Sequence, residues 1–217
     1  MTDFTARRTI MVDTQVRPSD VTKFPIIEAM LAVPREAYVT AGLREAAYLG
    51  ENLDLGGGRV ILDPRTLAKM LDALSIDGDD LVLDIGSAYG YSAAIIARMA
   101  EAVVAVEEND LMVKDAQRTL IEHGADNVIV HHGPLRAGAA EHGPYDVITL
   151  QGGVEHLPDA ITDQLKEGGR IACLFMQGPL GQVRIGHRID GRINWRFAFN
   201  AAAPVLPGFE RHAVFIL

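Results

Sequence analysis

The stretch LVLDIGSAYGYSAAIIARMAEAVVAVEEN, residues 81–109, decides the fold of this chain. Its first five residues form a mostly apolar run, as in strands that are buried on both faces of a parallel sheet. A turn between Gly86 and Gly90 follows, then a helix-forming segment, then a second apolar run that ends at Glu107. An acidic side chain about twenty residues beyond such a turn can accept both hydroxyls of a ribose. The stretch therefore predicts a strand–helix–strand unit that binds a nucleoside.

The spacing of the glycines narrows the ligand. Asp84, Gly86 and Gly90 form D-x-G-x-x-x-G, whereas a dinucleotide fold uses G-x-G-x-x-G to leave backbone N–H groups free for a pyrophosphate. The chain also lacks a G-x-x-x-x-G-K-[ST] loop for a triphosphate. With its acidic strand end downstream, the segment resembles the cofactor loop of S-adenosylmethionine (SAM)-dependent methyltransferases. There the first acidic residue faces the methionine end of the cofactor, and the later one faces the ribose.

Length and composition set the outer bounds. The chain has 217 residues, 48% of them hydrophobic, which suits a single α/β domain. We expect N-terminal helices and an acceptor-side segment over 1–75, and a Rossmann-like core over 76–217. The net charge of −9 argues against a nucleic-acid partner. No apolar stretch is long enough for a transmembrane helix, and residues 1–15 lack the apolar core of a signal peptide, so a cytoplasmic location is expected.

The elements around the central stretch predict a doubly wound, mostly parallel, seven-stranded sheet. Residues 4–33 read as two helices, 47–60 as an irregular segment with three glycines, and Asp63-Pro64 as the start of a helix to Leu74. Alternating strands and helices follow. They comprise a helix over 110–123, strands over 127–131 and 145–150, a helix over 158–166 and a strand over 170–175. Gly168-Gly169 is expected to form the turn between this last helix and the last strand. Asp190-Gly191 between alternating runs predicts a closing antiparallel hairpin.

Several segments, in order, resemble the protein-L-isoaspartate O-methyltransferase family. The resemblance covers residues 8 to 176 or so. Its segments are MVDTQVRP (11–18), IIEAMLAVPREAYV (26–39), VILDPRTLAKMLDAL (60–74), LVLDIGSAYGYSAAIIARMA (81–100), NVIVHHGPLRAG (127–138) and PYDVITLQGGVEHLPDAITDQLKEGGRIACL (144–174).

Membership in this family implies SAM as methyl donor and a damaged aspartyl side chain of a protein or peptide as acceptor. It further implies a monomeric repair enzyme. By position, the cofactor-binding residues are Asp84, Gly86, Ser87, Ala88, Gly90, Tyr91, Glu107, Gly133, Pro134 and Leu135. The acceptor carboxylate, with a pKa of about 4, is already ionised at neutral pH, so the reaction needs alignment and charge neutralisation but no general base.

The acceptor segment departs from the family pattern. The family has a hydroxyl residue two places before the proline, where this chain has Leu62, and Asp63 fits the role of a helix cap. Loss of a hydrogen bond to a charged group costs roughly 1.5–3 kcal/mol, a ten- to hundredfold loss of rate. Leu62 and Asp63 are nevertheless the candidate acceptor-side residues. An acceptor of another kind, including a small molecule, is therefore the first alternative.

The cofactor loop departs as well. Ala88 and Tyr89 stand where the family has glycine and a small residue, Pro134 replaces an aspartate, and Gln151 begins a segment that differs from the family's Thr-Ala-Ala type. At a left-handed position Ala88 would cost about 1–2 kcal/mol. These changes make a second alternative, a scaffold that has lost catalysis and acts by binding.

No metal site is expected from the sequence. His131-His132 and Glu155-His156 are ligand types, but neither pair has a second cluster at zinc spacing. The one cysteine, Cys173, lies in an apolar run and reads as a core residue.

Overall fold

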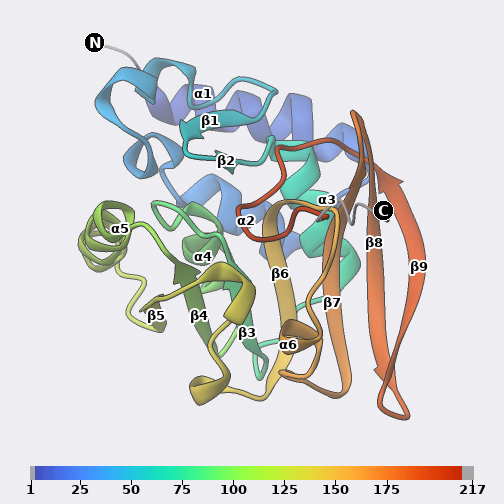
Figure 1. The fold of residues 1–217 in the computed structure, drawn as a ribbon. Coiled ribbons are helices and arrows are strands. Elements are labelled where there is room, and N and C mark those ends of the chain that lie inside the picture. The colour runs from blue at the N-terminus through green and yellow to red at the C-terminus, as the bar shows by residue number, and fades with distance from the viewer. Residues whose placement is uncertain (1–2, 212–217) are drawn as a thin grey trace.

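The computed structural model describes residues 3–211 and contains the predicted seven-stranded sheet (Figure 1). The strand order is β5-β4-β3-β6-β7-β8-β9. The pairs from β5 to β7 are parallel, and β8 and β9 are antiparallel. The strands are β3 (Leu81–Ile85), β4 (Ala102–Glu107), β5 (Val128–His132), β6 (Tyr145–Val154), β7 (Leu165–Gln177), β8 (Leu180–Ile189) and β9 (Arg192–Asn200).

Helices cover the sheet, and the central strands are buried on both faces as predicted. Successive residues alternate between two apolar clusters: Val82 and Val103 belong to one, Leu83 and Val104 to the other. The first cluster includes the N-terminal helices and α3. The helices are α1 (Phe4–Met11), α2 (Phe24–Ala32), α3 (Pro64–Leu74), α4 (Tyr91–Ile96), α5 (Asp110–Glu122) and α6 (Asp159–Thr162). In the described part of the chain, none of them is long and apolar enough to cross a membrane.

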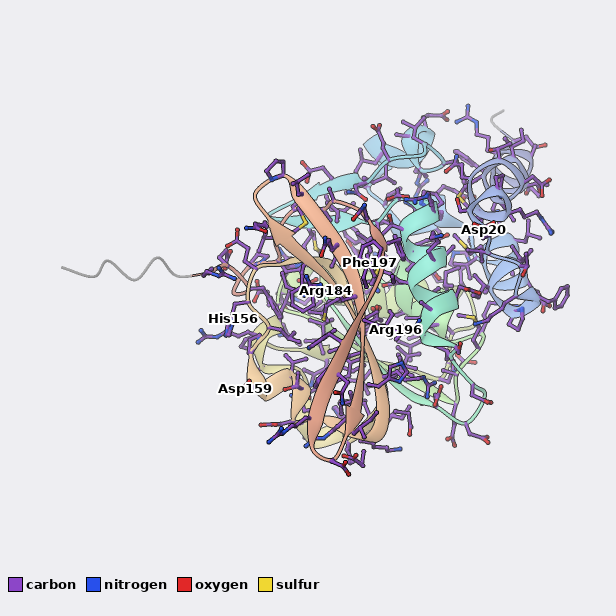
Figure 2. All side chains as sticks on the ribbon, turned by 90° about the vertical axis from the view of Figure 1, so that its right-hand side faces the viewer. Asp20, His156, Asp159, Arg184, Arg196 and Phe197 are labelled. Carbon is purple, nitrogen blue, oxygen red and sulfur yellow. The ribbon has the colours of Figure 1, made fainter. Side chains whose placement is uncertain are left out.

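The structure confirms two element boundaries that were predicted from local sequence signals. Asp63 caps α3, because its side chain accepts a hydrogen bond from the Thr66 backbone at 2.9 Å, and Pro64 opens the helix. Asp190 and Gly191 both have positive φ, as a two-residue hairpin turn requires. Figure 2 looks onto the resulting β8–β9 hairpin, which carries the labelled Arg184 on β8 and Phe197 on β9.

Two predicted segments are wrong in part. The segment 47–60 is not wholly irregular, because Leu53–Gly56 and Arg59–Ile61 form a small antiparallel hairpin, β1–β2. The helix expected over 158–166 is limited to α6, since Leu165 already pairs with Tyr145 and begins β7. Gly168 and Gly169 lie inside β7 at a register irregularity instead of between a helix and a strand. In both places strand pairing with a distant residue outweighs the local pattern.

Candidate functional site

The turn after β3 has the backbone geometry that its glycines allow. Gly86 and Gly90 have φ of 78° and 91°, and the Gly86 N–H donates to the Val106 carbonyl at 2.9 Å. Ala88 also lies in the left-handed region, with φ of 49°. The strain predicted for alanine at this position is therefore present, on the order of 1–2 kcal/mol.

Asp84 is fully buried beneath this turn, and its carboxylate is engaged by the chain itself. Ser92 Oγ donates to Oδ2 at 2.6 Å, and Gln151 Nε2 donates to Oδ1 at 2.7 Å. Burial raises the pKa of Asp84 to about 6, against the opposing effect of these two hydrogen bonds. Gln151, which replaces a family residue, thus serves to hold this acid.

Glu107, the expected ribose ligand, is fully buried and paired with Arg59. The Arg59 Nε lies 3.0 Å from Oε2, and its Nη2 lies 3.1 Å from Oε1. Backbone N–H groups of Ala88, Glu108 and Asn109 also donate to the two oxygens at 2.9–3.1 Å. A carboxylate offers about four lone-pair sites, so these donors saturate it. No acceptor capacity is left for a ribose.

The residues expected on the adenine side follow β5. The Gly133 N–H donates to the Glu107 carbonyl at 3.1 Å, and Pro134 precedes a short 3₁₀ turn that begins at Leu135. Leu135 is fully buried and approaches Gly86, where it shares an apolar cluster with Leu206. The structure thus brings the adenine-side residues and the glycine turn together, around an apolar side chain from the C-terminal part of the chain.

Arg35 fixes the backbone of the acceptor segment through a hydrogen bond. This arginine is fully buried, and its Nη2 donates to the Leu62 carbonyl at 2.8 Å while Nε donates to the Ala47 carbonyl at 2.7 Å. The Leu62 side chain is only 1% exposed. Asp63 turns its carboxylate to the start of α3, as predicted. In this arrangement the Leu62 side chain is closed to an acceptor peptide, whereas Asp63 is partly exposed.

The remaining residues of the glycine turn, Ser87, Tyr89 and Tyr91, have different surroundings. Ser87 is nearly buried, and its hydroxyl has no partner within residues 3–211. Tyr91 packs between Arg35, whose guanidinium lies 4.8 Å from the ring centroid, and Tyr38. Tyr89 is only partly buried, and burial together with the nearby Asp115 of α5 raises the pKa of its hydroxyl. Tyr89 therefore lies on the α5 side.

Little space remains where these residues meet. A cavity of about 10 Å³ lies between the acceptor segment and the loop; it is lined by Val60, Ile61, Leu62, Leu67, Ser87, Tyr91, Ser92 and Gln151. Small-molecule and cofactor pockets measure about 300 Å³ or more. Of the residues that the resemblance assigns to SAM, Ser87 and Tyr91 line this cavity. Because Glu107 is also occupied by Arg59 and by backbone donors, the assembled residues do not fit SAM in this arrangement.

Four residues with a role in this site were not predicted from the sequence: Arg35, Arg59, Ser92 and Leu206. Arg59 gave a usable signal, since it is a lone cation between a glycine run and the apolar stretch Val60–Leu62. Leu206 lies between two prolines in a segment without regular pattern, and no local signal marked it.

The fold also brings His131 beside Glu141 and His142, so that three residues that could ligate a metal lie together. His131 Nδ1 and His142 Nε2 lie 3.5 and 3.3 Å from a carboxylate oxygen of Glu141. The side chain of Glu141 is 69% exposed, so the cluster is a surface ion pair whenever either histidine is protonated.

Comparisons with known proteins show the family of this chain. The family model for protein-L-isoaspartate(D-aspartate) O-methyltransferase matches residues 8–184. The chain is 37% identical, over 88% of its length and 84% of the relative's, to protein-L-isoaspartate O-methyltransferase 2 of Pelobacter propionicus. It is 36% identical to protein-L-isoaspartate O-methyltransferase 1 of Rhodopseudomonas palustris, over 87% of this chain and 75% of that one.

Two solved structures share the fold. One is a protein-L-isoaspartate O-methyltransferase with a TM-score of 0.80 and 25% identity; the match covers 94% of this chain and 65% of that one. The other, from Plasmodium falciparum, is described as a protein of this kind in complex with S-adenosyl-L-homocysteine (SAH). It has a TM-score of 0.79 and 18% identity, over 95% of this chain and 99% of the other.

Proposed function

The chain belongs to the protein-L-isoaspartate(D-aspartate) O-methyltransferase family, whose cofactor is SAM, and we propose that it methylates the carboxylate of damaged aspartyl residues in proteins. The family match over most of the chain is the observation that carries this proposal. The loop from Asp84 to Gly90, with Glu107 at the next strand end, supports it.

The proposed site has two parts. Asp84, Gly86, Ser87, Ala88, Gly90, Tyr91 and Glu107, with Gly133, Pro134 and Leu135, form the cofactor side. Leu62 and Asp63 form the acceptor side, and Arg35 fixes that segment through the Leu62 carbonyl. When bound, SAM supplies an activated methyl group, but the crevice is closed in this structure. We also propose that the protein is single-domain, monomeric and cytoplasmic. The buried Cys173 forms no disulfide, as is usual in the reducing cytoplasm.

The direct test is incubation of the purified chain with methyl-labelled SAM and an isoaspartyl peptide. We expect a base-labile methyl ester on this peptide and none on the matching normal-aspartyl peptide. Equal, background-level labelling of the two peptides would refute the repair activity.

A second candidate is a binding scaffold without catalysis. Closure of the crevice favours it, because Glu107 is saturated by Arg59 and by backbone donors. Detectable turnover of SAM with any acceptor excludes this candidate. Failure of both SAM and SAH to bind at millimolar concentration would favour it over the enzyme.

A further inference from the structure

The segment after β9, residues 201–209, crosses the carboxyl ends of the central strands, and we call it the C-terminal segment. In Figure 1 it is the red stretch that returns from β9 between β2 and the upper end of β6. It forms a parallel bridge to the end of β6: the Gly153 N–H donates to the Pro204 carbonyl at 2.8 Å, and the Leu206 N–H donates to the Gly153 carbonyl at 2.9 Å. It therefore lies over the site at which a ligand of such a sheet binds.

Leu206 fills the space above the glycine turn. Its side chain is completely buried, and a methyl group built on Gly86 would lie 3.1 Å from its Cδ2. A methyl group on Gly152 would lie 2.7 Å from its Cγ, so Leu206 is in close contact with both backbones. By the family's pattern, the methionine end of SAM belongs at this turn.

Arg59 closes the other end of the same crevice. By the family's pattern Glu107 faces the ribose, yet here it is saturated by the guanidinium and three backbone donors. The hairpin that carries Arg59 also meets the C-terminal segment: a methyl group on Gly58 would lie 3.2 Å from the Pro207 ring. The β1–β2 hairpin, which carries Arg59, and the C-terminal segment, which carries Leu206, are thus in contact with each other.

The C-terminal segment is attached by single hydrogen bonds and not by a continuous ladder: apart from the bridge at Gly153, the Ala201 N–H donates to the Gly181 carbonyl at 3.2 Å, and Asn52 Nδ2 donates to the Ala202 carbonyl at 2.8 Å. Its far end is held where the backbone N–H groups of Glu155 and His156 share the Phe209 carbonyl, at 2.9 and 3.0 Å. Its buried anchors include the side chains of Leu206 and Phe209. Closure also leaves polar atoms unsatisfied, because Ser87 Oγ and Arg59 Nη1 are buried without a partner among the described residues. Segments of irregular backbone outside the continuous hydrogen-bond ladder of a sheet or helix are those that open locally.

We propose that the C-terminal segment and Arg59 form a gate that occupies the cofactor crevice, so that SAM enters only when Leu206 and Arg59 leave it. The proposal rests on the proposed function for the identity of the ligand. Apparent affinity for SAM is then the intrinsic affinity multiplied by the fraction of molecules with an open gate. Weakening the closed state must tighten binding, which is the reverse of what removing a cofactor contact does.

The test is titration of SAM and SAH by calorimetry into the wild type and Leu206→Ala. We expect Leu206→Ala to bind at least tenfold more tightly. Leu180→Ala is the matched control, since Leu180 lies on β8 and is 75% exposed, and its affinity should equal that of the wild type. Phe209→Ala, which removes the second anchor, should act in the same direction and replaces Leu206→Ala if that variant does not fold.

Hydrogen exchange gives a second readout on the wild-type protein. With saturating SAH, we expect faster exchange at the amides of Gly153, Leu206, Glu155 and His156, whose bonds hold the segment. Tight SAM binding with these amides still protected would overturn the gate. So would an unchanged affinity in both anchor variants, or no binding by any variant at millimolar SAM.

The two proposals fail separately. Tighter SAM binding by Leu206→Ala without any methyl ester would reject the repair activity and keep the gate. Methylation by the wild type with an affinity that the anchor variants do not change would keep the repair activity and reject the gate.

Discussion

The two walls of the crevice differ in how they are built. The loop wall, residues 84–90 with Glu107, comes from one continuous stretch and keeps the family's spacing. The covering wall, residues 59–62 with the C-terminal segment, comes from two parts of the chain that are far apart in sequence. The loop wall has the form of a cofactor site, whereas the covering wall fills it. A preserved motif therefore specifies where a ligand would bind, but the residues opposite it decide whether there is room.

The largest expected effect comes from breaking the contact between the walls at Arg59. In Arg59→Ala the buried Glu107 carboxylate loses its charged partner, which we expect to lower the free energy of unfolding by about 3–5 kcal/mol. Urea denaturation at neutral pH measures this loss. Arg184→Ala, at an exposed position on β8, serves as control and should change stability by less than about 0.5 kcal/mol. A loss below about 1 kcal/mol in Arg59→Ala would mean that the backbone donors alone stabilise Glu107.

A second effect, confined to the loop wall, is the dependence of stability on pH through Asp84. Its pKa in the folded protein is about 6, above the value of 3.8 for an exposed side chain. The folded state therefore holds this proton when the unfolded state has lost it, so Asp84 lowers stability as pH rises through the window from about 4 to 6. Asp84→Asn keeps the hydrogen bond from Gln151 and removes the buried charge.

We expect Asp84→Asn to be more stable than the wild type at pH 7 by on the order of 2–3 kcal/mol, and equal to it near pH 4. Denaturation of the two proteins at several pH values measures this difference. A difference that does not vary between pH 4 and pH 7 would show that Asp84 is not the titrating group.

The covering wall is also tested at the acceptor position. Leu62→Ser restores the hydroxyl of the family pattern, and we expect methylation of an isoaspartyl peptide to rise about ten- to hundredfold, or about 1.5–3 kcal/mol. Leu62→Ala removes a similar volume without adding the hydroxyl, so it is the matched control. Rates are compared per folded molecule, because Leu62 is buried. Equal rates for the serine and alanine variants would show that acceptor recognition does not depend on this hydroxyl.

The smallest effect is expected at Ala88 in the loop wall. Its φ of 49° favours glycine, so Ala88→Gly should raise the free energy of unfolding by about 1 kcal/mol or less. Thermal unfolding measures the shift. Ala93→Gly within α4 is the opposite control and should lower stability by about 1 kcal/mol. If both variants are destabilised alike, the turn does not strain alanine.

Much of the fold was predictable because its signals are local. The apolar runs of the central strands, the Asp63-Pro64 helix start and the Asp190-Gly191 turn each depend on a few neighbouring residues. The errors, at β1–β2 and at the start of β7, occur where short segments take their conformation from distant partners. Short glycine-rich segments have little preference of their own, so the pairing of Leu53 with Ile61 or of Tyr145 with Leu165 decides them.

The sequence by itself determined the family, the succession of strands and helices along the chain and the identity of the loop wall, since all three depend on spacing along the chain. Only the tertiary structure decided that Arg59 saturates Glu107, and that Leu206 packs against Gly86. The partners in these contacts lie far apart in sequence, and their side chains are ordinary in their local context. They matter because the folded sheet brings them into one crevice, where burial makes an unpaired charge costly and leaves no space for a second occupant.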